Sequence, residues 1–209
     1  RFDKSSKKED SPYPLVLLAE NNQGYRNLMK LVTLGFLDGF YYKPRIDKEI
    51  LREHHQGLIG LSGCLTGELA RLIQARNYEA ARKVAQEYRD ILGSDNYFLE
   101  IQDQNIEEQK EINRVLADLS AELGIPLVAT NDVHYTSQDD STAHDVLLCV
   151  QTGSTLGEED RMKFTTNEFY LKSPEEMAAV FADYPEAVSN SEVIADRCDV
   201  KIDFDKIYL

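Results

Sequence analysis

The residues of this chain best suited to chemistry are an aspartate and a histidine that stand two positions apart. Asp132 and His134 follow the mainly apolar run 126–130, which is typical of a short buried strand. Side chains at alternate positions of a strand point to the same face, so these two are expected to converge. A carboxylate beside an imidazole suits a divalent cation such as zinc or manganese. The same spacing is also compatible with Asp132 capping the next segment while His134 hydrogen-bonds to it.

A cysteine earlier in the chain is a third candidate ligand. Cys64 directly follows the stretch 57–63, which is typical of a strand that ends in a glycine turn. Zinc accepts mixed sulfur, nitrogen and oxygen ligands, and a catalytic zinc also holds an activated water. We therefore expect Cys64 to share a pocket with Asp132 and His134 if these strand ends meet. The alternative is that Cys64 is a small buried residue in a tight turn.

Other titratable side chains have two explanations each. His144 and Asp145 stand at the start of an expected helix about ten residues after His134. In that position they could orient the metal ligands through contacts with them, without binding the metal themselves. A packing role at the helix start explains them equally well. Glu68 and Glu100 stand near strand ends or in the turns that follow, and solvated or capping roles explain these two carboxylates as well as a role in the site does.

These residues are positioned by strands that alternate with helices. Strands are expected at 14–19, 57–63, 97–103 and 126–130, with a brief one at 168–171, and helices at 25–35, 47–54, from 64, 78–91, 112–123, 141–150, from 173 and 185–198. Short connections between alternating elements imply an α/β fold with parallel strands and right-handed crossovers. No glycine-rich phosphate loop follows a strand, which weakens a nucleotide-binding open sheet. A β/α barrel gathers its chemistry at the carboxyl ends of its strands, where the candidate ligands stand.

The composition restricts the class of protein. The 209 residues carry a formal net charge of -14, so the chain alone is poorly matched to nucleic acid, which attracts clustered Lys and Arg. The compact basic spots are Lys7 with Lys8 and Arg161 with Lys163, and a solvated surface explains both. Three widely spaced cysteines favour a reducing cytoplasm over a disulfide framework. No apolar run could span a membrane, and Arg1 opens a polar segment unlike a signal peptide, so we expect a piece of a longer protein.

Several long motifs in a fixed order give a more specific indication than any single pair. They resemble the PHP (polymerase and histidinol phosphatase) domain of bacterial DNA polymerase III alpha subunits, and the resemblance covers nearly the whole chain. The motifs are LVLLAEN (15–21), GYRNL (24–28), GFYYKPRID (39–47), LSGCLTGE (61–68), ATNDVHY (129–135) and FYLKS (169–173).

The resemblance implies a distorted seven-stranded β/α barrel with a metal cluster at the strand ends. Residues 1–150 would form a partial barrel that lacks the first strands, and residues 151–209 the C-terminal helices of the domain and the start of the connection to the polymerase domain. Cys64, Asp132 and His134 match metal-ligand positions of the family. Its H-x-H and T-D-H segments and a further Glu have no counterpart here, so we expect this chain alone to bind zinc or manganese weakly or not at all.

Two classes of function follow from the resemblance. The first is a metal-dependent phosphoesterase or 3′–5′ exonuclease, in which metal-activated water attacks a phosphodiester. The second is a docking module that stabilises the polymerase or binds a separate proofreading exonuclease. The retained trio of candidate ligands favours the first.

The resemblance also implies what kind of larger protein this chain comes from. The parent would be a DNA-directed DNA polymerase, a nucleotidyltransferase of chromosomal replication, whose polymerising carboxylates lie beyond Leu209. We therefore assign no catalytic residue here and expect this chain alone to be inactive. Its expected partners are the rest of the polymerase chain, replisome subunits, and DNA through the parent protein.

Overall fold

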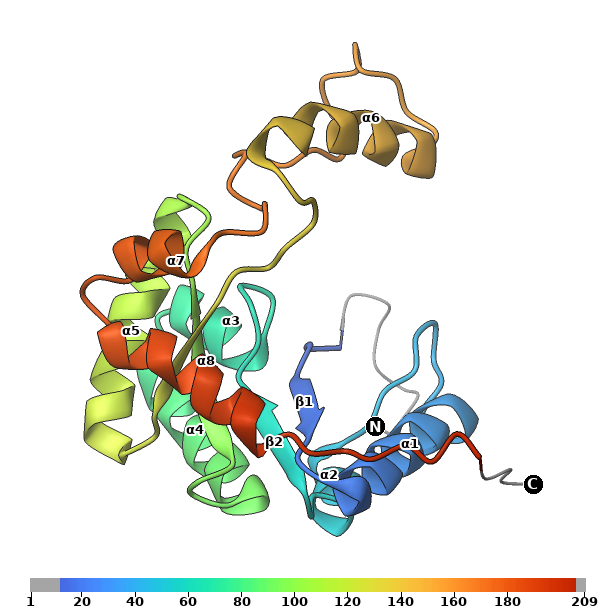
Figure 1. Ribbon diagram of the computed structural model, residues 1–209, viewed down its shortest axis with the longest axis vertical. Helices are drawn as coiled ribbons and strands as arrows, with labels where there is room; N and C mark the ends of the chain where they lie inside the picture. Colours follow the sequence, from blue (N-terminus) through green and yellow to red (C-terminus); the bar gives the residue numbers. More distant parts are fainter. Residues whose placement is uncertain (1–11, 206–209) are drawn as a thin grey trace.

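Four strands form one sheet in the computed structural model, which describes residues 12–205. The order across the sheet follows the chain: β1 (Val16–Ala19), β2 (Leu58–Leu61), β3 (Tyr97–Gln102) and β4 (Leu127–Thr130). β2, β3 and β4 are parallel, and β1 is antiparallel to β2. The four main strands expected from the sequence are confirmed, and the fold is mixed α/β (Figure 1).

Helices connect these strands and follow the last one (Figure 1). Their bounds are α1 (Asn22–Leu37), α2 (Lys48–Glu53), α3 (Glu68–Gln74), α4 (Tyr78–Leu92), α5 (Glu107–Leu123), the 3₁₀ turn η1 (Gln138–Asp140), α6 (Ser141–Thr152), α7 (Pro174–Val180) and α8 (Pro185–Arg197). The start of α7 shows how closely the sequence specifies a boundary. The Ser173 hydroxyl accepts a hydrogen bond from the Glu176 amide at 3.2 Å, and the Glu176 carboxylate accepts one from the Ser173 amide at 2.7 Å. This reciprocal pair is a capping box.

The direction of β1 differs from the prediction, which had all four strands parallel. The Glu20 amide, directly after β1, donates to the Gly57 carbonyl, directly before β2, at 2.9 Å. The first turn of α1 packs directly on Gly57. Gly24 lies so close to it that a Cβ there would be 1.7 Å from the Gly57 carbonyl oxygen. The end of β1 is thus fixed beside the beginning of β2, which makes the pair antiparallel. Apolar periodicity identifies a strand but carries no information on its direction.

The barrel expected from the resemblance is not confirmed. Within residues 12–205 the sheet is open, with β1 and β4 at its two edges. Its interior is nevertheless covered on both faces, since every residue of β2 and β3 is buried. Leu58 and Leu99 belong to the larger core with residues of α3, α4 and α5, whereas Ile59 and Val128 pack against Ile194 of α8. The covered sheet is a firm support for the side chains at its ends.

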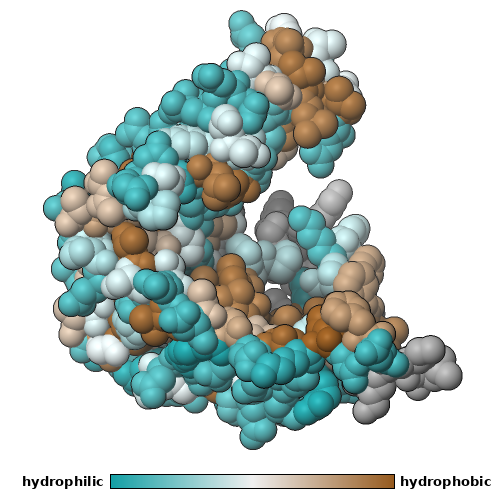
Figure 2. All heavy atoms as spheres, in the orientation of Figure 1, coloured by the Kyte–Doolittle hydropathy of each residue, from teal (hydrophilic) through white to brown (hydrophobic). Residues whose placement is uncertain are grey.

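One part of the molecule stands away from the sheet. Figure 1 shows α6 and the loop after it projecting from the body, and Figure 2 shows the surface hollowed between this arm, residues 141–162, and α1. The arm exposes Leu147 and Val150, at 60% and 74% of their surface. The expected domain boundary at residue 150 falls inside α6. The division at residue 150 therefore stays a prediction.

Two expectations concern the membrane and the chain ends. None of the helices found between residues 12 and 205 combines the length and the apolar character that a membrane crossing needs. The basic pair Lys7 and Lys8 lies outside the described residues, and so do residues 206–209, the end of the segment expected to lead into the polymerase domain.

Candidate metal centre

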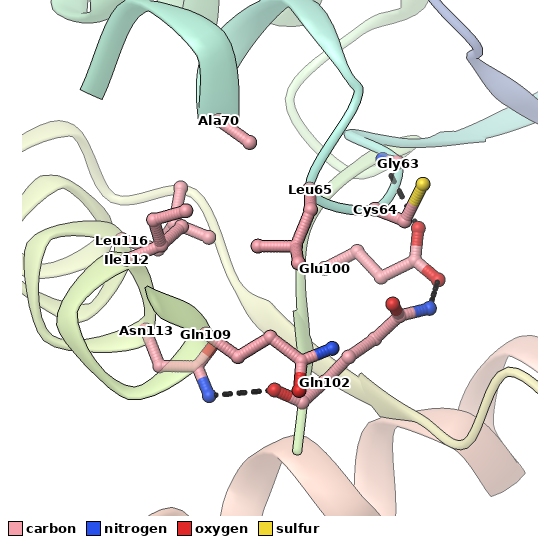
Figure 3. A pocket seen from close by; sticks show the side chains of 10 residues that line it. All are labelled: Gly63, Cys64, Leu65, Ala70, Glu100, Gln102, Gln109, Ile112, Asn113 and Leu116. Atoms are coloured by element: carbon pink, nitrogen blue, oxygen red, sulfur yellow. Dashed lines mark hydrogen bonds between the residues drawn. The ribbon is translucent and has the colours of Figure 1, made fainter. Parts of the chain in front are cut away.

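The carboxyl ends of β2, β3 and β4 meet at one edge of the sheet because the three strands are parallel. Gly63 and Cys64 follow β2, Glu100 and Gln102 lie on the last part of β3, and Asp132 follows β4. Figure 3 shows Cys64 close to the Glu100 side chain. Cys64 and Asp132 thus lie at the same end of the sheet, but they follow β2 and β4, which β3 separates.

Asp132 and His134 form a converging pair. Oδ1 of Asp132 and Nε2 of His134 lie 3.4 Å apart, with the two side chains 41% and 39% exposed. Two ligands that each lie about 2.1 Å from a tetrahedral zinc are separated by roughly 3.4 Å. The pair therefore fits as two ligands of one divalent ion.

The reason for this convergence differs from the one predicted. β4 ends at Thr130, so Asp132 and His134 lie beyond the strand and do not alternate along it. Asp132 instead has a left-handed backbone, with a φ of 46°. The alternative is met in one part only: the capping box of the following turn is made by Ser137 and Asp140, not by Asp132, whereas His134 does lie in polar contact with Asp132.

Aromatic rings fix the orientation of the His134 imidazole. Phe164 meets it edge-on at 4.7 Å between ring centroids, and Phe169 and His144 follow at 5.7 and 5.6 Å. The His134 amide also donates to the Phe169 carbonyl at 2.8 Å. Edge-to-face packing of this kind restricts the ring, so that its Nε2 stays directed toward Asp132.

The predicted supporting residues separate into two environments. His144 lies beside the His134 ring and against Tyr135, at 5.3 Å between centroids. Asp145 turns to Arg161, whose guanidinium donates to both of its oxygens at 2.5 and 2.7 Å. These hydrogen bonds hold the pKa of Asp145 below its usual range. Arg161, expected on a solvated basic spot, is instead largely buried, with 9% of its side chain exposed.

Glu100 is a residue of this edge that the sequence left unranked. It is 5% exposed and accepts hydrogen bonds from the Gly63 amide at 3.0 Å, the Thr130 hydroxyl at 2.5 Å and the Gln102 amide group at 3.3 Å. Burial raises its pKa, the nearby charge of Asp132 adds to the rise, and these hydrogen bonds oppose it. The available signal was a single carboxylate inside the mainly apolar run 97–101, where a buried charge needs partners.

Cys64 lies near this carboxylate but apart from the converging pair. Its Sγ lies 3.3 Å from the Thr66 hydroxyl. It lines a small cavity at β3, α3 and α5 whose wall is mixed, with the polar side chains Glu100, Gln102, Gln109 and Asn113 and the apolar ones Leu65, Ala70, Ile112 and Leu116 (Figure 3). Over residues 12–205, no three His, Cys, Asp or Glu side chains gather closely enough to hold a metal ion together. The structure thus brings Asp132 and His134 together and leaves the third ligand, Cys64, a prediction.

Glu68 belongs to a different environment. Its carboxylate accepts hydrogen bonds from Lys48 at 3.0 Å and from the Tyr88 hydroxyl at 2.8 Å. These bonds join the first turns of α2 and α3 to α4, which is a packing role.

Comparison with known proteins supports the resemblance indicated by the sequence motifs. The family model described as the PHP domain matches residues 2–104. The DNA polymerase III subunit alpha of Treponema pallidum is 48% identical over 203 residues, which cover 97% of this chain and 17% of that protein. The subunits of Borreliella burgdorferi and Thermus aquaticus are 45% and 43% identical, covering 95% and 97% of this chain and 18% and 17% of those proteins.

The chain thus spans roughly one-sixth of the length of these curated relatives, at 17% to 18%. Cys64 lies within the residues matched by the family model, whereas Asp132 and His134 lie in the part covered by the relatives alone. Residues 2–104 match the PHP domain family, and the chain as a whole is similar to a segment of DNA polymerase III alpha subunits.

Proposed function

We propose that this chain is part of a replicative DNA polymerase alpha subunit of the bacterial cytoplasm and carries part of a divalent-metal phosphoesterase site. The observation that supports the site is the 3.4 Å separation between Oδ1 of Asp132 and Nε2 of His134 at the carboxyl edge of the sheet. Carboxylate and imidazole are ligands that zinc and manganese share. The similarity to polymerase subunits over nearly the whole chain supports the setting.

Each residue has a distinct task in this proposal. Asp132 supplies an anionic oxygen, and His134 a nitrogen whose direction is fixed by Phe164 and Phe169. Glu100 holds the turn after β2 to the end of β4 through Gly63 and Thr130. A divalent ion bound by the pair would supply an activated water and would stabilise charge on a phosphodiester during 3′-end cleavage.

The proposal includes weak metal binding by this chain alone. Asp132 and His134 offer two ligand atoms, and Cys64 a possible third, whereas a tight protein site for zinc has at least three protein ligands. A complete ligand set in the intact protein would therefore bind the ion more tightly than these residues do.

A docking role is the second candidate, and the arm favours it. Leu147, Val150, Leu156 and Met162 expose 56% to 74% of their surface on one projecting segment. Exposed apolar groups on one segment mark a contact surface more often than a free one. The partners would be the rest of the polymerase chain, other replisome subunits or a separate proofreading exonuclease, with DNA reached through the parent protein.

Metal-dependent cleavage by the intact polymerase subunit tests the enzymatic proposal. We expect Asp132→Asn and His134→Ala to reduce removal of a mismatched 3′-nucleotide at least tenfold, because each removes a metal ligand. His54→Ala is the matched control, since His54 ends α2 away from the pair. Unchanged cleavage by both site variants would refute the assignment, and an intact subunit without cleavage would favour the docking role.

A further inference from the structure

The turn that presents Asp132 is strained and must be held by its surroundings. Asp132 is one of four non-glycine residues with a positive φ among residues 12–205, at 46°. Aspartate tolerates this left-handed conformation better than most residues, but the conformation is still sparsely populated. It persists where neighbouring groups restrict the chain. The groups that restrict this turn act on the preceding residue, Asn131.

Asn131 is held from three directions. Its side-chain amide donates to the Tyr170 carbonyl at 2.6 Å. Its backbone carbonyl accepts from the Gln104 side chain at 3.0 Å. Its side-chain oxygen accepts from the Lys172 ammonium group at 3.4 Å. These three contacts come from two other segments of the chain, so Asn131 cannot rotate without breaking several of them.

Lys172 is a buried cation at this point. Only 2% of its side chain is exposed, and its ammonium group also donates to the Glu168 carbonyl at 2.5 Å and lies 3.3 Å from the Glu168 carboxylate. The same ammonium group lies 4.4 Å from the centre of the Tyr170 ring. A lysine is rarely buried unless it is paired, and here the pairing directs it at Asn131.

Gln104 is equally constrained. It is fully buried, at 0% exposure. Its backbone amide donates to the Gln109 side-chain oxygen at 2.8 Å, and the Gln109 side-chain amide donates to the Gln104 side-chain oxygen. Its backbone carbonyl accepts from the Thr166 hydroxyl at 2.7 Å. Its side-chain oxygen and its main chain are therefore held by other residues, and its side-chain nitrogen donates to Asn131.

The segment that carries Lys172 also contacts the other side of the pair. Tyr135 and Tyr170 form a parallel bridge, where the sequence predicted a brief strand at 168–171. The His134 amide donates to the Phe169 carbonyl at 2.8 Å. The segment 168–172 thus restrains Asn131 and His134 on either side of Asp132.

We propose that Lys172 and Gln104 are positioning residues for the metal pair. By holding Asn131, they keep Asp132 in its left-handed conformation, and so keep its Oδ1 directed at Nε2 of His134. The consequence for metal binding rests on the proposed function, whereas the consequence for the backbone of Asp132 does not.

The experiment compares the 209-residue chain with its Lys172→Met variant by NMR, with Zn²⁺ alone as the probe. A positive φ brings the amide and α protons of Asp132 close together and gives a strong nuclear Overhauser effect between them. We expect Lys172→Met to lose this strong signal. We also expect the Zn²⁺ concentration at the midpoint of the His134 ring-nitrogen shift to rise about tenfold, as for other residues that support a metal ligand.

Lys48→Met is the matched control. Lys48 is also a partly buried lysine that pairs with carboxylates and lies 4.6 Å from a tyrosine ring, but its partners are Glu68, Glu87 and Tyr88. We expect this variant to be destabilised while the Asp132 backbone and the Zn²⁺ midpoint stay unchanged. A retained positive φ in Lys172→Met with a midpoint within twofold of wild type would overturn the proposal.

A second variant covers the case in which Lys172→Met does not fold. Asn131→Ser replaces a partly exposed side chain by one too short to reach Lys172 and Tyr170 together, and we expect the same loss of the positive φ. A wild-type His134 signal that never responds to Zn²⁺ would refute the proposed metal function. The Asp132 backbone in the variants would then still decide whether Lys172 and Asn131 hold the turn.

Discussion

Glu100 joins two strand ends through a buried carboxylate. Its two oxygens accept hydrogen bonds from Gly63 after β2, from Thr130 at the end of β4, and from Gln102 on its own strand. Buried polar groups of this kind are retained because each donor would otherwise lose its partner. Glu100 therefore has a structural role at the same edge that presents Asp132. Substitution of Glu100 tests this contribution to stability separately from metal binding by Asp132.

We expect Glu100→Leu to lower the free energy of unfolding by about 1–3 kcal/mol at pH 7, because the Gly63 amide and the Thr130 hydroxyl lose their acceptor. Urea unfolding followed by circular dichroism measures the change. Glu186→Leu, the same replacement at an exposed position of α8, is expected to stay within about 0.5 kcal/mol of wild type. Equal stability of Glu100→Leu and wild type would mean that these hydrogen bonds contribute nothing.

The contrast between Glu100 and the metal pair shows what the residue types alone could predict. Asp132 and His134 were recognisable by type and spacing, yet their convergence depends on a left-handed residue that no strand periodicity reports. Glu100 stands in a run of apolar residues, so its burial could be predicted, but its partners Gly63 and Thr130 come from other elements. The hydrogen-bond partners that come from distant parts of the chain could not be predicted from this single sequence.

At the scale of elements, the presence and order of the four strands were predicted better than their directions. The start of α7 follows from local chemistry, because Ser173 and Glu176 satisfy each other's backbone groups within one turn. The antiparallel β1 depends instead on the contact between Gly24 and Gly57, two residues that are far apart in the chain. A local capping signal thus fixed the start of α7, whereas α3 and α5 begin at Glu68 and Glu107 and not at the expected residues 64 and 112. Tertiary contacts determined how the strands pair.

The arm is held together by one ion pair whose pH dependence can be predicted. Arg161 lowers the pKa of Asp145 below its usual range, chiefly by hydrogen bonding. A carboxyl group with a lowered folded-state pKa stabilises the folded state above its unfolded pKa, and this contribution is lost as the pH falls through the folded pKa. We therefore expect the loop after α6 to loosen on acidification below the usual aspartate range.

Asp145→Asn should reproduce that loosening at neutral pH, because an amide cannot pair with both arms of the Arg161 guanidinium as an anion does. Hydrogen exchange of residues 153–161 measures it, and we expect faster exchange there than in wild type. Asp160→Asn, on the exposed part of the same loop, is the control. Equal exchange in Asp145→Asn and wild type would show that the ion pair does not hold the loop.

At the scale of the whole molecule, the surface combines two properties that oppose each other. The net charge of -14 favours separation of copies of the chain, whereas the hollow between the arm and α1 is bordered by apolar side chains (Figure 2). On α1 the exposed fractions reach 56% for Phe36 and 76% for Leu37. Apolar burial is hardly affected by salt, whereas repulsion between charged surfaces weakens as salt is added. Association between copies should therefore depend on ionic strength.

We expect this chain to self-associate more strongly as salt concentration rises, because screening removes the repulsion and leaves the apolar contacts. Sedimentation velocity at several protein and salt concentrations measures this. Phe36→Ser with Leu37→Ser should abolish the association, whereas Val193→Ser, at a 49% exposed position of α8, should not. A strictly monomeric wild-type profile at high protein and salt concentration would show that the exposed apolar surface of α1 does not bring copies of this chain together.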